Sequence, residues 1–188
     1  MQFGVSGISF LLMLILTWKL MHSNPVKSIT LSATDLGMAQ RWAERRNKGK
    51  FQGGSYHNKT PFENHLLGVK GEIGTAKYLR ASLDGTHKPN GDNGIDLIYK
   101  GSSIDVKSTN HEYPKLIVPD LKKLKADILV LCTVKEHLVN IHGWMKSEDF
   151  RFMCEYLFGV KYPYYYVPCD QLDPINKLIE CQKIEFLN

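Results

Sequence analysis

The sequence contains 188 residues, of which 43% are hydrophobic and 23% are charged. This length and composition are typical of one globular domain and exclude a disordered, collagen-like or coiled-coil protein. Lysine and arginine number 24 and aspartate and glutamate 19, so the net charge is +5. This modest excess is compatible with a polyanionic partner but does not require one.

The N-terminal segment is apolar and carries no charge up to Trp18. It is shorter than the roughly 20 apolar residues of a membrane-spanning helix, and it lacks the basic start and cleavage site of a signal peptide. Three interpretations stay open: a membrane tether through residues 3–21, a buried helix, or a translated stretch upstream of a start at Met21. The sequence predicts an apolar segment over 1–22 and a single cytoplasmic domain over 30–188, because basic residues follow the segment.

Two helices are predicted in the first half of this domain. Residues 35–47 have helical spacing of apolar side chains after a capping Thr34, and residues 63–81 have the same spacing. Between the two helices, residues 48–64 are rich in Gly, Asn, Lys and Ser and predict a long exposed loop.

Strands dominate the second half. The predicted elements are strands at 95–99 and 103–109 joined by a turn at Lys100-Gly101, a polar stretch over 110–126, strands at 128–134 and 138–144, a helix over 147–158, a strand at 164–167 and a short helix after Asp173-Pro174. This order predicts the α/β class, in the α+β-like form of a mixed sheet flanked by helices.

Cysteine and histidine spacing gives no metal signature. The four cysteines form no C-x-x-C pair, and His137 and His142 lie five residues apart. We therefore expect reduced thiols and ordinary histidines, with Cys132 buried as a small apolar residue inside its strand.

The register of the predicted hairpin follows from its apolar pattern. A two-residue turn pairs Leu97 with Ile104 and Ile95 with Val106, which places all four apolar side chains on one face. A slip of one residue would mix polar and apolar side chains on both faces.

The same register places Asp96 directly opposite Asp105. Two opposed carboxylates repel each other unless a cation binds between them, and oxygen ligands suit Mg²⁺ or Mn²⁺. Lys107 lies on the same face as Asp105 and adds a positive charge. The alternative is a surface ion pair of Asp105 with Lys107 and a solvated Asp96.

A third carboxylate lies on the second helix. Val69, Glu72, Ala76 and Leu79 share one helical stripe, which predicts that Glu72 is buried. A buried carboxylate costs several kcal/mol unless it is paired or binds a metal. The alternatives to metal binding are a structural ion pair with Lys107 or a side chain that extends to solvent.

Together these residues resemble a known family. Glu72 on a helix, Asp96 at one strand and Asp105-Val106-Lys107 on the next strand resemble the signature of the PD-(D/E)xK nuclease superfamily. The resemblance covers about residues 63–145 and is to phage and bacterial members. It implies a restriction-endonuclease-like core.

The resemblance also implies a mechanism. Glu72, Asp96, Asp105 and the main-chain carbonyl of Val106 would bind Mg²⁺, with Mn²⁺ as an alternative, and Lys107 would position or deprotonate the attacking water. The chain would then be a metal-dependent DNA endonuclease that hydrolyses phosphodiester bonds in the cytoplasm, which is the host's cytoplasm if a phage encodes it.

Two alternatives share these residues. One is a Holliday-junction or other branched-DNA resolvase, which a homodimer or higher oligomer would favour. The other is a nucleic-acid-binding protein without catalytic activity. In each case, the nucleic acid would contact the basic residues Arg45, Arg46, Lys48, Lys50 and Lys59 and the hydroxyls of Ser108 and Thr109.

Overall fold

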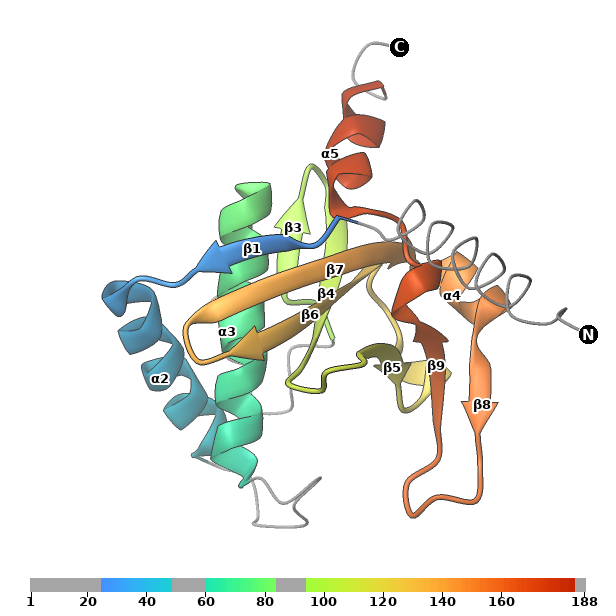
Figure 1. Ribbon diagram of the computed structural model, residues 1–188, viewed down its shortest axis with the longest axis horizontal. Coiled ribbons are helices and arrows are strands. Elements are labelled where there is room, and N and C mark those ends of the chain that lie inside the picture. Colours follow the sequence, from blue (N-terminus) through green and yellow to red (C-terminus); the bar gives the residue numbers. More distant parts are fainter. Residues whose placement is uncertain (1–24, 49–59, 84–93, 185–188) are drawn as a thin grey trace, which may run out of the picture.

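The computed structural model describes residues 25–48, 60–83 and 94–184, with side chains up to Glu180 (Figure 1). The predicted apolar segment over 1–22 lies outside these residues. Within the described part of the chain, no helix has the length and apolar character needed to cross a membrane.

The fold is built on a mixed six-stranded sheet (Figure 1). From one edge to the other its strands are β1 (Lys27–Thr30), β7 (Leu138–Lys146), β6 (Ile128–Lys135), β4 (Ser102–Thr109), β3 (Leu97–Tyr99) and β2 (Ser82–Leu83). Strands β4 and β6 run parallel, and the other neighbouring pairs run antiparallel. Strand β6 is buried along nearly its whole length, as its continuous apolar run predicts.

Helices cover one face of this sheet. They are α2 (Ala33–Asn47), α3 (Pro61–Leu79) and α5 (Ile175–Ile184). Helix α2 begins earlier than predicted, because Ser32 and Asp35 form a capping box that replaces the expected cap at Thr34. Helix α3 has an equivalent capping box and packs against β4, β6 and β7.

A second, three-stranded antiparallel sheet covers the other face together with α4 (Ser147–Met153). Its strands are β5 (Lys115–Val118), β9 (Tyr164–Pro168) and β8 (Glu155–Leu157), accompanied by the short 3₁₀ helices η1 (Leu121–Lys123) and η2 (Cys169–Gln171). Figure 1 shows β8 and β9 extending away from the main sheet.

This second sheet corrects two predictions. The polar stretch over 110–126 contains β5 and η1, and the helix predicted over 147–158 ends at Met153. Residues of β5 and β8 form strands because they pair with β9, which lies far along the chain from β5. The predicted class, a mixed sheet flanked by helices, is confirmed.

The hairpin of β3 and β4 has the predicted turn. Leu97 pairs with Ile104, and Lys100 and Gly101 both have positive φ, of 49° and 87°. Two positive φ values are characteristic of a type I′ turn, whose twist matches that of the strands. Strand β3 begins at Leu97, however, so the predicted ladder pair of Ile95 with Val106 is wrong.

Glycines bring α3 very close to the sheet. A Cβ atom added to Gly71 would lie 1.9 Å from Ser108 Oγ, and one added to Gly74 would lie 2.7 Å from Val139 side-chain atoms. Deeper in the same interface, Thr75 Oγ1 lies 3.2 Å from Cys132 Sγ. Cys132 is fully buried, which confirms the prediction of a small buried residue, and this burial raises the pKa of its thiol to about 12.

This close contact predicts opposite effects for two glycine-to-alanine substitutions in α3. Gly74→Ala should lower the free energy of unfolding by about 1–3 kcal/mol, because the methyl group overpacks the contact with Val139. Gly68→Ala is the matched control, since the nearest atom would be 3.9 Å away; it should gain up to about 1 kcal/mol from helix propensity. Urea denaturation measures both, and equal stabilities would contradict the close packing.

Candidate active site

The carboxylate of Asp96 binds the main chain of β4. The main-chain N–H of Asp96 donates to Ile104 O at 2.8 Å, and the side-chain Oδ2 of Asp96 accepts from Val106 N at 2.7 Å. Asp96 therefore does not occupy the predicted ladder position opposite Asp105. Instead its carboxylate takes the place of a main-chain acceptor and binds the peptide that joins Asp105 to Val106.

Asp105 is paired with a lysine beside this peptide. Its Oδ2 lies 2.7 Å from Lys107 Nζ. Asp96 and Asp105 are only 8% and 6% exposed, so both carboxylates are buried rather than solvated. A Cβ atom added to Gly94 would lie 3.8 Å from Asp105 Oδ2 and from the Lys123 carbonyl, so three chain segments converge here.

The main-chain carbonyl of Val106 points toward the side of β4 on which Asp96 lies. In an extended strand, the N–H and C=O of one residue point to the same neighbour, and the N–H of Val106 meets Asp96. Among the described residues, the ladder with β3 ends at Ile104 on this side of β4. This edge thus presents the Val106 carbonyl and two carboxylates within one short stretch.

Glu72 is buried as predicted but has an unexpected partner. It is 4% exposed, and Arg46 of α2 binds both carboxylate oxygens, at 2.6 and 2.8 Å. Both alternatives to metal binding, an ion pair with Lys107 and a solvent-directed side chain, are therefore wrong. This bidentate ion pair between Arg46 and Glu72 joins α2 to α3 through charge-assisted hydrogen bonds.

Side chains alternate between the two faces of β4, and this alternation separates Glu72 from the Asp105–Lys107 ion pair. Ile104 and Val106 belong to the core under α3, whereas Asp105 and Lys107 align with Leu129 and Leu131, which face the second sheet. Asp105 and Lys107 therefore point to the face opposite α3. The structure brings Asp96, Asp105 and Lys107 together and leaves Glu72 on the helical side.

The predicted basic contacts have different surroundings. Arg45 and Lys48 are exposed at the end of α2, whereas the guanidinium of Arg46 is held by Glu72. Lys50 and Lys59 lie outside the described residues.

The two predicted hydroxyls point to opposite faces of β4. Ser108 Oγ is buried against Gly71 and has no hydrogen-bond partner among the described residues. Thr109 is partly exposed on the face of Lys107, where its Oγ1 accepts from His111 N at 3.2 Å.

Sequence reasoning missed a polar contact on this face. Thr133 of β6 is the Cα partner of Thr109, and its Oγ1 lies 2.9 Å from His142 Nε2. Burial lowers the pKa of His142, which favours a neutral ring. The contact depends on a register shift between Leu131 and Cys132, which the sequence pattern does not reveal.

The oxygen atoms at the edge of β4 suit a hard cation. Within residues 25–48, 60–83 and 94–184, no three side chains of His, Cys, Asp or Glu converge to hold a metal ion. Mg²⁺, however, is commonly held by only one or two carboxylates, with other oxygen ligands and water. Asp96, Asp105 and the Val106 carbonyl fit that chemistry.

No protein-family model matches the sequence, and no curated protein matches it either. The functional assignment therefore depends on the side chains described above.

The Arg46–Glu72 pair predicts a stability effect. Arg46→Met removes two hydrogen bonds from a buried carboxylate while keeping the aliphatic stem, and should lower the free energy of unfolding by about 3 kcal/mol. Adding Glu72→Gln should restore most of that loss, because a neutral amide is less costly to bury than a carboxylate.

Urea denaturation of the metal-free protein measures these variants. Arg45→Met is the control, since it replaces an exposed arginine and should change stability by less than about 0.5 kcal/mol. A double variant no more stable than Arg46→Met alone would show that the carboxylate charge is not what Arg46 compensates.

Proposed function

We propose that the chain is a metal-dependent nuclease that hydrolyses phosphodiester bonds in DNA. One observation carries this proposal. The buried carboxylate of Asp96 binds the peptide N–H of Val106, next to the buried carboxylate of Asp105, and Lys107 Nζ lies 2.7 Å from Asp105. Burying two carboxylates side by side is costly for stability, and a bound cation is a physical reason for a fold to retain them. The resemblance to the PD-(D/E)xK pattern points the same way.

In this proposal, three groups hold the metal. Asp96 and Asp105 supply carboxylate oxygens and Val106 supplies its carbonyl, with Mg²⁺ as the ion and Mn²⁺ as the substitute. When bound, the ion would polarise the phosphate and lower the pKa of a coordinated water. The bond from Val106 N to Asp96 holds one of the two carboxylates at the edge of β4 in the absence of an ion.

Lys107 has two roles in the proposal. Its ammonium group is held beside Asp105 and its side chain is about one-third exposed, so it can reach both the site and an incoming phosphate. There it orients the attacking water and offsets the negative charge that develops on the phosphate oxygens. The water oxygen would bond to phosphorus as the P–O3′ bond breaks, and the leaving 3′ oxygen would take up a proton to become a hydroxyl, in exchange for the proton that the water gives up. The other product, a 5′-phosphate, is the one that the resemblance implies.

Glu72 has a supporting role rather than a place in the metal shell. Its carboxylate is bound by Arg46, and α3 covers the other face of the sheet. It fixes the end of α2, where Arg45 and Lys48 are exposed to contact a nucleic-acid backbone. On the face of Lys107, Thr109 adds a hydroxyl that can donate to phosphate oxygens.

The proposal predicts loss of cleavage from two conservative substitutions. Asp105→Asn removes a ligand charge and Lys107→Met removes the ammonium group, and each should lower the cleavage rate by about 100-fold or more. Lys135→Met is the control, because Lys135 is exposed at the end of β6 and away from the site. Gel assays with Mg²⁺ measure the rates, and near-normal cleavage by either site variant would refute the assignment.

The choice of DNA substrate separates the alternatives. Supercoiled, linear, single-stranded and four-way-junction DNA should be incubated with Mg²⁺, with Mn²⁺ and with EDTA, and chelation should abolish cleavage. Preferential cutting of the junction would favour the resolvase. DNA binding without cleavage of any substrate in either metal would favour the non-catalytic alternative.

A further inference from the structure

Most of the strongly exposed apolar side chains lie together in one part of the chain. We call residues 152–166 the aromatic arm; it consists of the end of α4, strand β8, the turn that follows and the first part of β9, and Figure 1 shows it extending away from the main sheet. A concentration of exposed apolar side chains marks a surface that contacts a partner. Among the described residues, six of the nine large apolar side chains that are most exposed belong to the arm: Phe152, Met153, Tyr156, Phe158, Val160 and Tyr162.

Contacts within the arm hold its rings in place. Tyr156 of β8 and Tyr165 of β9 are cross-strand partners, and their ring centroids lie 4.7 Å apart. The rings of Tyr164 and Tyr166 meet edge to face at 6.1 Å, and the Tyr166 hydroxyl donates to Glu155 Oε2 at 2.5 Å. Rings that are already ordered lose less conformational entropy when a partner binds, so the arm is prepared for a contact.

The charges of the arm favour a neutral partner. The arm contains one carboxylate, Glu155, and one ammonium group, Lys161, so its charges cancel, although the whole chain carries +5. The guanidinium of Arg151, which precedes the arm, donates to the main-chain oxygens of Leu121 and Leu124 and is thus directed into its own chain. Nucleic acids and anionic lipids are bound by surfaces with an excess of cations. A second copy of the chain, in contrast, can approach this neutral surface with little charge repulsion.

The arm also has the symmetry that contact with a second copy requires. Strand β8 is the outer strand of the second sheet in the order β5-β9-β8. Two identical outer strands that meet antiparallel are related by a twofold axis, which closes the assembly at two copies. Phe152 and Met153 precede β8 and Phe158 follows it, so exposed apolar side chains flank Tyr156 on both sides. With Tyr156 at the axis, the apolar group before β8 in one copy lies next to the apolar group after β8 in the other.

We propose that the chain forms a homodimer through the aromatic arm, in which β8 faces β8 of the second copy and Tyr156 lies at the twofold axis. A strand of three residues offers few main-chain hydrogen bonds, so aromatic side chains provide most of the contact. Asp105 and Lys107 lie outside the arm, and the proposal does not rest on the proposed nuclease activity.

Charge complementation at Tyr156 tests this dimer in the full chain. Sedimentation velocity in EDTA, over a range of protein concentrations, should show a particle of twice the chain mass. Tyr156→Lys and Tyr156→Glu should each raise the dimer dissociation constant by about 100-fold or more, because two like charges then face each other across the axis. An equimolar mixture of the two variants should associate at least about ten-fold more tightly than either variant alone, since lysine then faces glutamate.

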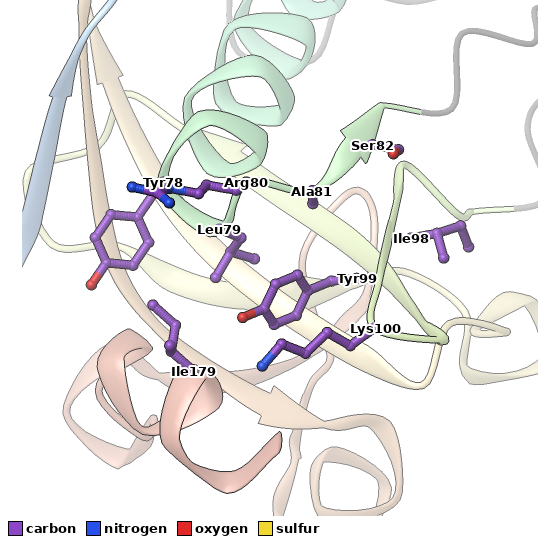
Figure 2. A pocket seen from close by; sticks show the side chains of 9 residues that line it. All are labelled: Tyr78, Leu79, Arg80, Ala81, Ser82, Ile98, Tyr99, Lys100 and Ile179. Atoms are coloured by element: carbon purple, nitrogen blue, oxygen red, sulfur yellow. The ribbon is translucent and has the colours of Figure 1, made fainter. Parts of the chain in front are cut away.

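Ile98 of β3 provides the matched controls. It lies on the main sheet beside the pocket at the end of α3 (Figure 2), and it is 46% exposed, close to the 50% of Tyr156. Ile98→Lys and Ile98→Glu should therefore leave the dimer dissociation constant unchanged.

Phe158→Ser separates loss of association from loss of folding. Phe158 is 77% exposed and follows β8, so its replacement keeps the contact of Tyr156 with Tyr165. This variant should weaken the dimer by about ten-fold or more while its circular dichroism spectrum stays that of the wild type.

Three results would overturn the proposal: a monomeric wild-type chain, association that the Tyr156 variants leave unchanged, or a mixture that associates no more tightly than its components. A monomer whose arm variants lose binding to DNA or to neutral lipid vesicles would overturn it in favour of that partner. A dimer that fails to cleave DNA in Mg²⁺ would instead count against the nuclease alone.

Discussion

The alternation of side chains along β4 is the constraint on which the rest of the structure depends. One set, including Ile104 and Val106, is buried under α3, and the other, including Asp105 and Lys107, faces the second sheet. The parallel ladder with β6 and the antiparallel hairpin with β3 both fix this alternation. A slip of one residue would bury the charged set in the helical core, so hydrophobic burial holds the polar cluster in place.

A carboxylate that binds main chain adds a second constraint. Asp96 closes the end of the β3–β4 ladder by accepting from Val106, which satisfies a buried N–H that would otherwise lack a ladder partner. The same bond orients the carboxylate at the strand edge. At Asp96 this structural role coincides with the proposed role in metal binding, whereas Glu72 and Arg46 form a pair that joins two helices.

Local patterns allowed correct prediction from the sequence. The Leu97–Ile104 register, the Lys100-Gly101 turn and the burial of Glu72 depend on the spacing of apolar residues a few positions apart, and all three are confirmed. The partner of Glu72 could not be found this way, because Arg46 lies 26 residues earlier and reaches it only through the packing of α2 on α3.

The second sheet was missed for a related reason. Strands β5 and β8 are short and are stabilised by pairing with β9, so their own sequence carries little periodic signal. The contact of Thr133 with His142 depends on a local shift in the β6–β7 register, which no alternation rule anticipates. Residue propensity and hydrophobic periodicity thus predicted individual helices and strands. The contacts between elements far apart in the sequence could be identified only in the folded structure.

The strand order of the main sheet bears on how two copies of the chain could associate. As described, its outer strands are β1 and β2, of four and two residues. Short outer strands expose few main-chain donors and acceptors, so a neighbouring molecule finds little backbone with which to continue the sheet. This geometry disfavours filament-like stacking of sheets from one molecule to the next.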